Sequence, residues 1–295
     1  MKELVIISGK GGTGKTSIVA SFAALAKNKV LADCDVDAAD LHLILEPKST
    51  VKEVFRAGKE ARVLKGHCVA CGKCEEVCVF DAVFFDGPGN GTVEKTFRID
   101  PIACEGCGVC YHFCDYDAVE FKEAECGHWF ISESRFGTMV HAKLGIAAEN
   151  SGKLVTLVRK EARKIAEKEK SGLLIIDGPP GIGCPVIASI TGVDMVLVVT
   201  EPTLSGLHDL QRVGKLTRHF DIPTYVCINK YDINPELTEQ IESEANNEGI
   251  SVLGKVRYDS AVTKAQIKGQ SVVEFTDGGV SKDIGDLWEK VSLYL

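Results

Sequence analysis

The chain has 295 residues, a formal net charge of −8 and 12 cysteines, with 45% hydrophobic and 26% charged residues. This composition is typical of a folded globular protein and excludes disorder as its main state, and the acidic balance argues against a broad contact with nucleic acid. The sequence starts with a strand rather than a leader, and no apolar run approaches the ~18 residues of a membrane span, so we expect a cytoplasmic protein without a stable membrane anchor.

Short apolar strands alternate with amphipathic helices along most of the chain. Strands are predicted at 4–7, 29–33, 173–176, 195–199 and 225–228, and helices at 15–27, 152–170, 204–220 and 235–248. Buried strands separated by helices are typical of a parallel sheet covered on both faces. We therefore predict an α/β fold with a mostly parallel sheet and helices on both faces, and a loop at 149–153 that leads into a helix.

The first strand leads into a glycine-rich loop. Gly9-Lys10-Gly11-Gly12-Thr13-Gly14-Lys15-Thr16 fits the phosphate-binding pattern G-x-x-x-x-G-K-[ST] between a strand and a helix. Its glycines let backbone N–H groups converge on phosphate oxygens, and the helix adds its N-terminal dipole. We predict that this loop and Ser17 bind the nucleotide, with Lys15 on the β- and γ-phosphates and Thr16 on Mg²⁺.

Polar motifs follow the later strands as well. They are Asp33-Cys34-Asp35, Asp177-Gly178-Pro179-Pro180-Gly181, Thr200-Glu201-Pro202-Thr203 and Asn229-Lys230-Tyr231-Asp232. We expect Asp35 to orient the attacking water and Asp177 to hold Mg²⁺ through water. The last motif reads N-K-x-D, the pattern with which GTPases recognise guanine. The alternative role for Asp232 is to form a helix-capping turn before Pro235.

The variant of the loop with Lys10 resembles a known family. KGGTGKT resembles the deviant Walker A loop of the MinD/ParA/Mrp P-loop ATPases, a group that includes nitrogenase iron protein. The motifs at 33–35, 177–181 and 200–203 resemble switch I of that family and the switch II and T-E-P-T segments of its Mrp branch. The resemblance implies an ATPase with Lys10, Lys15 and Asp35 as catalytic residues. It also implies that Lys10 reaches across an ATP-bound dimer and that Asn229 contacts adenine.

A segment between switch I and switch II breaks the α/β pattern. It holds eight of the twelve cysteines in two similar halves, CVACGKCEEVCVFDAVFF and CEGCGVCYHFCDYDAVEF, and residues 60–125 contain 13 acidic and 6 basic side chains. We predict an ATPase domain at 1–58 and 126–295 and an inserted small α+β ferredoxin-like domain at 59–125. A turn is predicted at 86–91, and a hairpin between Cys78 and Cys104.

The cysteine spacing is that of a ferredoxin with two clusters. Both halves read C-x₂-C-x₂-C-x₃-C, a run whose fourth cysteine ligates the other cluster. We predict one [4Fe–4S] cluster on Cys68, Cys71, Cys74 and Cys114, and a second on Cys104, Cys107, Cys110 and Cys78. Zinc is the rival metal because four thiolates also suit it, and disulfides are disfavoured in the cytoplasm.

Three functions are compatible with these parts. In the first, ATP binding and hydrolysis gate electron transfer from the clusters to a partner protein. The second is an ATP-dependent factor for assembly of a metallocofactor, and the third is a positioning ATPase with a structural iron–sulfur module. We expect a homodimer, or a heterodimer with a paralogous ATPase. A basic membrane helix is not expected at the C-terminus, because Ile284, Leu287, Trp288 and Val291 form the apolar stripe of a helix docked on the sheet.

Overall fold

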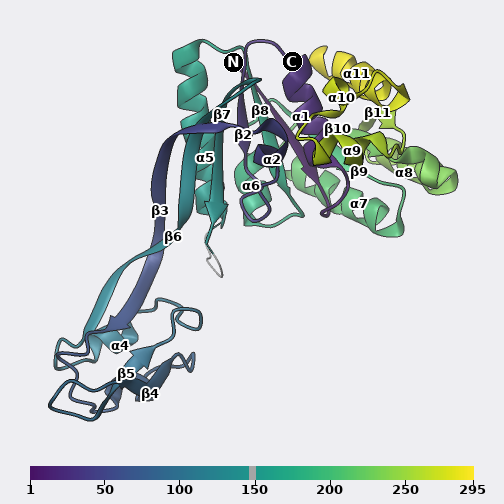
Figure 1. The fold of residues 1–295 in the computed structure, drawn as a ribbon. Helices are drawn as coiled ribbons and strands as arrows, with labels where there is room; N and C mark the ends of the chain where they lie inside the picture. The colour runs from purple at the N-terminus through teal and green to yellow at the C-terminus, as the bar shows by residue number, and fades with distance from the viewer. Residues whose placement is uncertain (146–150) are drawn as a thin grey trace. The chain divides into compact units, whose positions relative to one another are not determined.

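The computed structural model describes residues 1–145 and 151–295, and the chain divides into two units. Unit 1 comprises Met1–Glu53, His128–Leu144 and Ser151–Leu295; unit 2 comprises Val54–Gly127 and Gly145. Two long strands, β3 (Lys48–Val63) and β6 (Val119–Ser134), lead from one unit into the other (Figure 1). The predicted boundaries near residues 59 and 125 fall within these strands. Of the loop predicted at 149–153, Glu149 and Asn150 lie outside the described residues.

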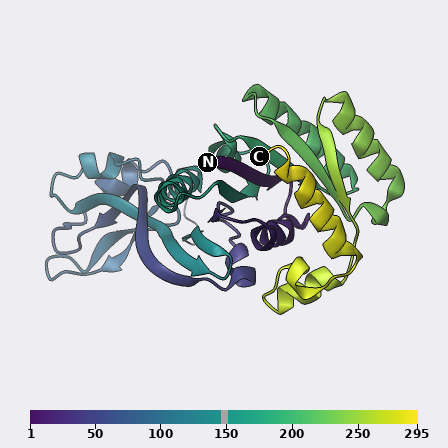
Figure 2. The same ribbon diagram turned by 90° about the horizontal axis from the view of Figure 1, so that it is seen from above.

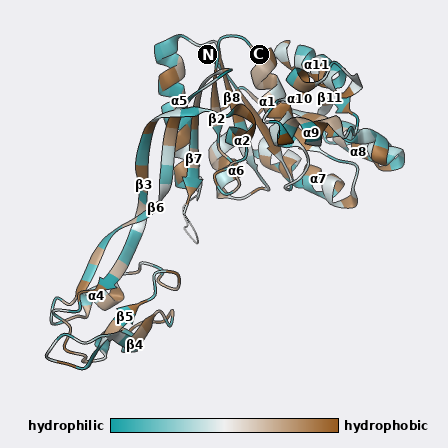
Figure 3. Cartoon of the chain, in the orientation of Figure 1, coloured by the Kyte–Doolittle hydropathy of each residue, from teal (hydrophilic) through white to brown (hydrophobic). Residues whose placement is uncertain are grey.

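The main sheet has nine strands among the described residues, in the order β11-β10-β9-β1-β8-β2-β7-β6-β3. Neighbouring strands from β11 to β7 are parallel, which confirms the predicted mostly parallel sheet. Their bounds are β1 (Lys2–Ser8), β2 (Lys29–Asp33), β7 (Gly137–Leu144), β8 (Leu173–Pro180), β9 (Met195–Thr200), β10 (Thr224–Asn229) and β11 (Ser251–Val256). The central strands are almost wholly apolar (Figure 3), as expected for strands buried on both faces.

Helices cover both faces of this sheet (Figure 2). One face carries α1 (Lys15–Leu25), α2 (Leu41–Leu45), α9 (Ala261–Ile267), α10 (Val272–Phe275) and α11 (Gly279–Ser292). The other carries α5 (Ser151–Glu169), α6 (Cys184–Ile190), α7 (Leu204–His219) and α8 (Pro235–Asn247), which is preceded by the short helix η1 (Tyr231–Ile233).

The C-terminal helix is docked as predicted. Ile284, Leu287 and Val291 of α11 are fully buried in the core, and Trp288 packs on Phe22 with 4.9 Å between ring centroids. None of the described helices combines the length and the apolar character needed to cross a lipid bilayer.

Unit 2 is a small α+β unit whose backbone repeats. The hairpin expected between the cysteine runs is present as β4 (Val83–Pro88) and β5 (Lys95–Ile99), which pair antiparallel. The turn predicted at 86–91 begins later, because β4 continues through Pro88. Each half also contains one helical turn, α3 (Lys73–Glu76) or α4 (Val109–His112).

Equivalent residues of the two halves have equivalent conformations. Gly72 and Gly108 precede the helical turns with φ of 83° and 75°. The amide of Glu75 donates to Gly72 O, and that of Tyr111 donates to Gly108 O, each at 3.1 Å. The internal sequence repeat is therefore a structural repeat, with residue 68 equivalent to residue 104 and so on along each half.

Candidate functional site

The glycine-rich loop and the start of α1 border a cavity of about 520 Å³. The loop and α1 contribute the lining residues Gly11, Gly12, Thr13, Gly14, Lys15, Thr16 and Ser17. Other parts of the chain contribute Asp35, Ala38, Leu43 and Pro180, among others. No acidic residue lies in the first turn of α1, so the N-terminal end of the helix keeps its partial positive charge. The cavity thus combines free volume, glycine backbone and a helix N-terminus, which together suit polyphosphate.

Three buried carboxylates surround Lys15 at the bottom of this cavity. Its Nζ lies 3.3 Å from Asp35 Oδ2 and bonds to Asp177 Oδ1. Burial lowers the pKa of Lys15, but Asp177 and Asp35 outweigh burial and the pKa is raised. Burial and the neighbouring Asp177 raise the pKa of Asp33 well above its usual range.

Two carboxylate oxygens in this group are left without a partner. Asp33 Oδ2 and Asp177 Oδ2 are buried and accept no hydrogen bond from any described residue. Such oxygens are costly to bury unless a cation or a donor satisfies them. Carboxylate and hydroxyl oxygens are the ligands that Mg²⁺ prefers, so Asp177, with Thr16 on the cavity wall, fits a divalent cation. Asp33, which the sequence placed only within switch I, belongs to the same buried group.

A second cavity of about 220 Å³ adjoins the loop on the side of β10 and β11. Asn229 lines it, but its amide nitrogen donates to Thr13 O at 2.7 Å. A Cβ on Gly14, which has a φ of 86°, would lie 2.3 Å from that nitrogen. Asp232 Oδ1 accepts from the Tyr258 amide at 2.7 Å, and it is Asn234 that caps α8. Asn229 therefore holds the glycine-rich loop on the side of this second cavity.

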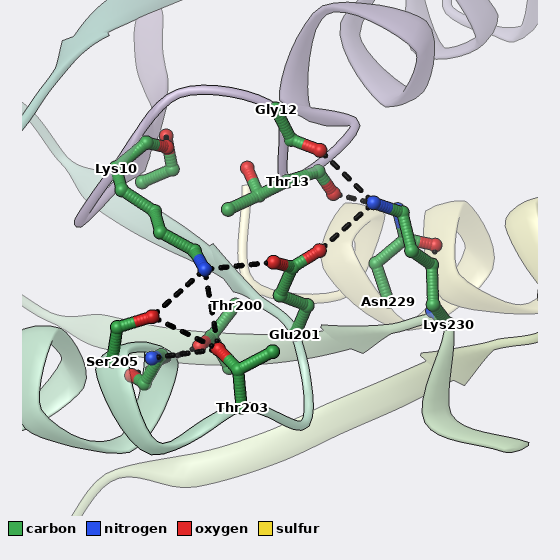
Figure 4. Close-up of polar contacts among 11 residues, drawn as sticks. Lys10, Gly12, Thr13, Thr200, Glu201, Thr203, Ser205, Asn229 and Lys230 are labelled. Carbon is green, nitrogen blue, oxygen red and sulfur yellow. Dashed lines mark hydrogen bonds and ion pairs between the residues drawn. The ribbon is translucent and has the colours of Figure 1, made fainter. Parts of the chain in front are cut away.

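Lys10 is held by its own chain (Figure 4). Its Nζ lies 2.9 Å from Glu201 Oε1 and donates to Thr203 Oγ1 at 3.2 Å and to Ser205 Oγ at 2.8 Å. Lys230 Nζ bonds to the other oxygen of Glu201 at 2.8 Å and to Gly12 O at 3.0 Å. Glu201 thus joins Lys10 of the glycine-rich loop to Lys230, which also binds the carbonyl of Gly12 in that loop.

The electrostatics of Glu201 agree with this role. Burial raises the pKa of Glu201, but Lys10 and Lys230 outweigh burial and the pKa is lowered. Thr203 also caps α7 by accepting from the Gly206 amide at 3.0 Å. The sequence indicated the T-E-P-T segment only as a family motif; it did not identify the bonds from Glu201, Thr203 and Ser205 to Lys10.

The eight cysteines of the two runs line two separate cavities in unit 2. One is lined by Cys68, Cys71, Cys74 and Cys114, and the other by Cys78, Cys104, Cys107 and Cys110. These are the two sets that the spacing predicts. Among the described residues, no three His, Cys, Asp or Glu side chains converge as ligands of a single metal ion. Each of these two cavities has a volume of about 20 Å³.

The remaining cysteines lie elsewhere. Cys34 and Cys227 are fully buried in the sheet, and burial raises the pKa of Cys227 to about 12. The Cys126 thiol donates to Ala57 O at 3.0 Å, and Cys184 is exposed at the start of α6.

Residues 4–272 match the family model of the CobQ/CobB/MinD/ParA nucleotide binding domain. The chain belongs to this family. It is 34% identical over 299 residues to the uncharacterized protein MJ0578 of Methanocaldococcus jannaschii, and the alignment covers 99% of this chain and 97% of that protein. It is also 26% identical over 152 residues to the iron-sulfur cluster carrier protein of Pyrococcus horikoshii, covering 48% of this chain and 52% of the carrier.

Solved structures of MinD share the fold. The cell division ATPase MinD of Pyrococcus furiosus superposes with a TM-score of 0.58 at 18% identity, over 100% of this chain and 99% of MinD. A MinD of Pyrococcus horikoshii complexed with Mg-ADP gives 0.55 at 16% identity, over 98% and 95% of the two chains. The α/β part of the molecule is therefore a MinD/ParA-family nucleotide-binding ATPase domain.

Proposed function

We propose that this MinD/ParA-family ATPase carries two [4Fe–4S] clusters and that its nucleotide state gates electron transfer from them to a partner protein. The observation that carries the proposal is the pair of cavities in unit 2, each lined by three cysteines of one run and the fourth cysteine of the other. All eight ligands of the two clusters come from this one unit. Four thiolates from one chain occupy all four corners of a cube, which suits a resident electron carrier.

The ATPase half of the proposal assigns a role to each residue of the loop cavity. Gly9, Lys10, Gly11, Gly12, Thr13, Gly14, Lys15, Thr16 and Ser17 bind the phosphates, and Asn229 lies on the side of the base. Thr16 and Asp177 would hold Mg²⁺, which would neutralise charge on the β- and γ-phosphates. Lys15 then turns from the carboxylates to the phosphates, and Asp35 orients the attacking water. Lys10 acts across an ATP-bound dimer, with a second copy or with a paralogous ATPase.

The test of cluster binding is anaerobic reconstitution followed by iron and sulfide analysis and electron paramagnetic resonance of the reduced protein. We expect about eight irons per chain, four for each cube. Cys78→Ser is expected to weaken the cluster on Cys104, Cys107 and Cys110, and Cys114→Ser the other. Cys126→Ser is the matched control, because this thiol of the same unit lines neither cavity. If spectroscopy of Cys78→Ser shows loss of the cluster on Cys68, Cys71 and Cys74 instead, the crossed ligation is wrong.

A second candidate is an ATP-dependent factor for metallocofactor assembly. It is favoured by the partial similarity to iron-sulfur cluster carrier proteins. Incubation of the ⁵⁷Fe-loaded protein with an apo-ferredoxin separates the two functions. Transfer of the labelled iron in an ATP-dependent step favours assembly, and retention of the label with one-electron reduction of the acceptor favours electron transfer.

A further inference from the structure

The two cysteine-lined cavities of unit 2 are built from equivalent positions of the structural repeat. We call the cavity lined by Cys68, Cys71, Cys74 and Cys114 the first cavity and the one lined by Cys78, Cys104, Cys107 and Cys110 the second cavity. Every residue that lines the first cavity has its repeat equivalent in the lining of the second. The cysteines are also matched in exposure, because each set has one buried, one exposed and two intermediate members. Solvent access to the ligands therefore does not distinguish the two cavities.

The charged residues of the lining do distinguish them. Lys73 lines the first cavity, and its equivalent in the second is Val109. Glu105 lines the second cavity, and its equivalent in the first is Val69. No other Lys, Arg, His, Asp or Glu among the described residues lines either cavity. The repeat thus places one cation beside the first set of thiolates and one anion beside the second.

The counter-ion of Lys73 does not change the direction of this difference. Lys73 Nζ lies 2.7 Å from Asp115 Oδ2, and these two residues adjoin Cys74 and Cys114, two predicted ligands of one cluster. Asp115 itself does not line the first cavity. Glu105 is exposed and forms no ion pair with any other described residue. Even with Asp115 counted, the first cavity adjoins a neutral pair and the second adjoins an uncompensated negative charge.

Unequal charge has a direct consequence for reduction. A four-iron cube held by four thiolates gains one negative charge when it is reduced, and its potential depends on net charge, hydrogen bonds to sulfur and solvent exposure. A nearby cation stabilises the added charge, and a nearby anion opposes it. Because the exposure of the ligands is matched, Lys73 and Glu105 should raise the reduction potential in the first cavity relative to the second.

We propose that Lys73 and Glu105 give the two clusters unequal reduction potentials, so that the first electron is held in the first cavity and the cluster of the second cavity is the stronger reductant. This inference rests on the proposed function, because it assigns roles to the two proposed clusters. An electron that passes from the second cavity to the first leaves the second cluster oxidised and the first reduced. We expect the equilibrium constant of this transfer to be about tenfold in favour of the first cavity, which is 59 mV for one electron.

The test is a redox titration of the anaerobically reconstituted full chain with dithionite, followed by electron paramagnetic resonance. We expect the native protein to take up two electrons in two separate one-electron steps. Glu105→Gln should raise the lower potential and leave the upper one in place, and Lys73→Met should lower the upper potential. Glu123→Gln is the matched control, because this exposed carboxylate of the same unit lines neither cavity. It should move neither step.

The repeat supplies a second variant that keeps the net charge. Lys73→Val/Val109→Lys moves the cation to the equivalent position of the second cavity, and each new residue already occurs at the equivalent position. It should bring the two potentials together or reverse their order. Cys114→Ser identifies the step that belongs to the first cavity, and we expect it to alter the spectrum of the species reduced at the higher potential.

Iron analysis of the same samples separates the ways in which the inference fails. Coincident steps in a native protein with about eight irons overturn the inference and leave the proposed function intact. A native separation that neither Glu105→Gln nor Lys73→Val/Val109→Lys narrows overturns the role of these side chains. If Cys114→Ser alters the species reduced at the lower potential, the assignment of the first electron is wrong. A native protein that binds no iron overturns the proposed function and the inference with it.

Discussion

In the proposed ATP-bound dimer, Lys10 has to leave Glu201 before it acts in the partner subunit, and the substitution Glu201→Gln lowers the free-energy cost of this release. The Lys10 side chain is 33% exposed and that of Glu201 is 15% exposed. A pair with this exposure contributes ~1 kcal/mol, at the upper end of the range for surface pairs. A dimer releases two such lysines, so Glu201→Gln lowers the cost by about 2 kcal/mol, and we expect about 30-fold tighter dimerisation with a non-hydrolysable ATP analogue.

Sedimentation velocity over a series of protein concentrations measures this change. Asp194→Asn makes the same change of charge at a surface ion pair with Lys2 (3.2 Å) and is expected to leave dimerisation unchanged. Lys230→Met removes the other lysine from Glu201 and distinguishes release of Lys10 from release of Lys230. The reasoning is refuted if Glu201→Gln dimerises no more tightly than the native protein, or if Lys230→Met produces the same gain.

Three further predictions concern the ATPase unit. Lys15→Ala is expected to abolish ATP hydrolysis without loss of iron. It should also lower the melting temperature unless Mg²⁺ is added, because Asp35 and Asp177 lose their counter-ion. Calorimetry with and without Mg²⁺ tests this, and a variant that is as stable as the native protein without Mg²⁺ would contradict it. Gly14→Ala is expected to cost ~2 kcal/mol or more in nucleotide binding, because its Cβ meets Asn229 and its φ is positive. Gly285→Ala in α11, with nothing within 4 Å of its Cβ, is the control and should bind normally by titration calorimetry. Burial and the neighbouring His42 lower the pKa of His141 to about 4, below its unfolded value. The folded protein therefore loses stability as the pH falls from about 6.5 to 4. His141→Gln should recover ~2–3 kcal/mol of that loss in urea unfolding at pH 4, and an unchanged pH profile would exclude His141 as the cause.

The periodicity of the sequence predicts the central strands and most helices because their burial is local and regular. The strand at 173–176 and the helix at 204–220 are observed as β8 and α7 within a few residues. β3 and β6 were not predicted: most residues of β3 are exposed and most of β6 are only partly buried, so neither has the continuous buried apolar run of a central strand. Such strands depend on pairing between distant segments, and no short window of sequence contains that information.

The same limit applies to the candidate site. The glycine-rich loop and the cysteine runs are local patterns, so their residues could be named from spacing alone. The Lys10–Glu201–Lys230 bridge joins residues that follow three different strands. Those strands, β1, β9 and β10, are neighbours in the sheet only because of its strand order.

The central claim is that nucleotide state controls electron delivery from unit 2. The most direct measurement is the rate at which the reduced protein with eight irons delivers electrons to ferric cytochrome c, compared between the ATP-analogue and ADP forms at equal ionic strength. The account predicts rates that differ several-fold while the reduction potentials of the clusters stay the same. Equal rates in two forms that both contain bound nucleotide would contradict it.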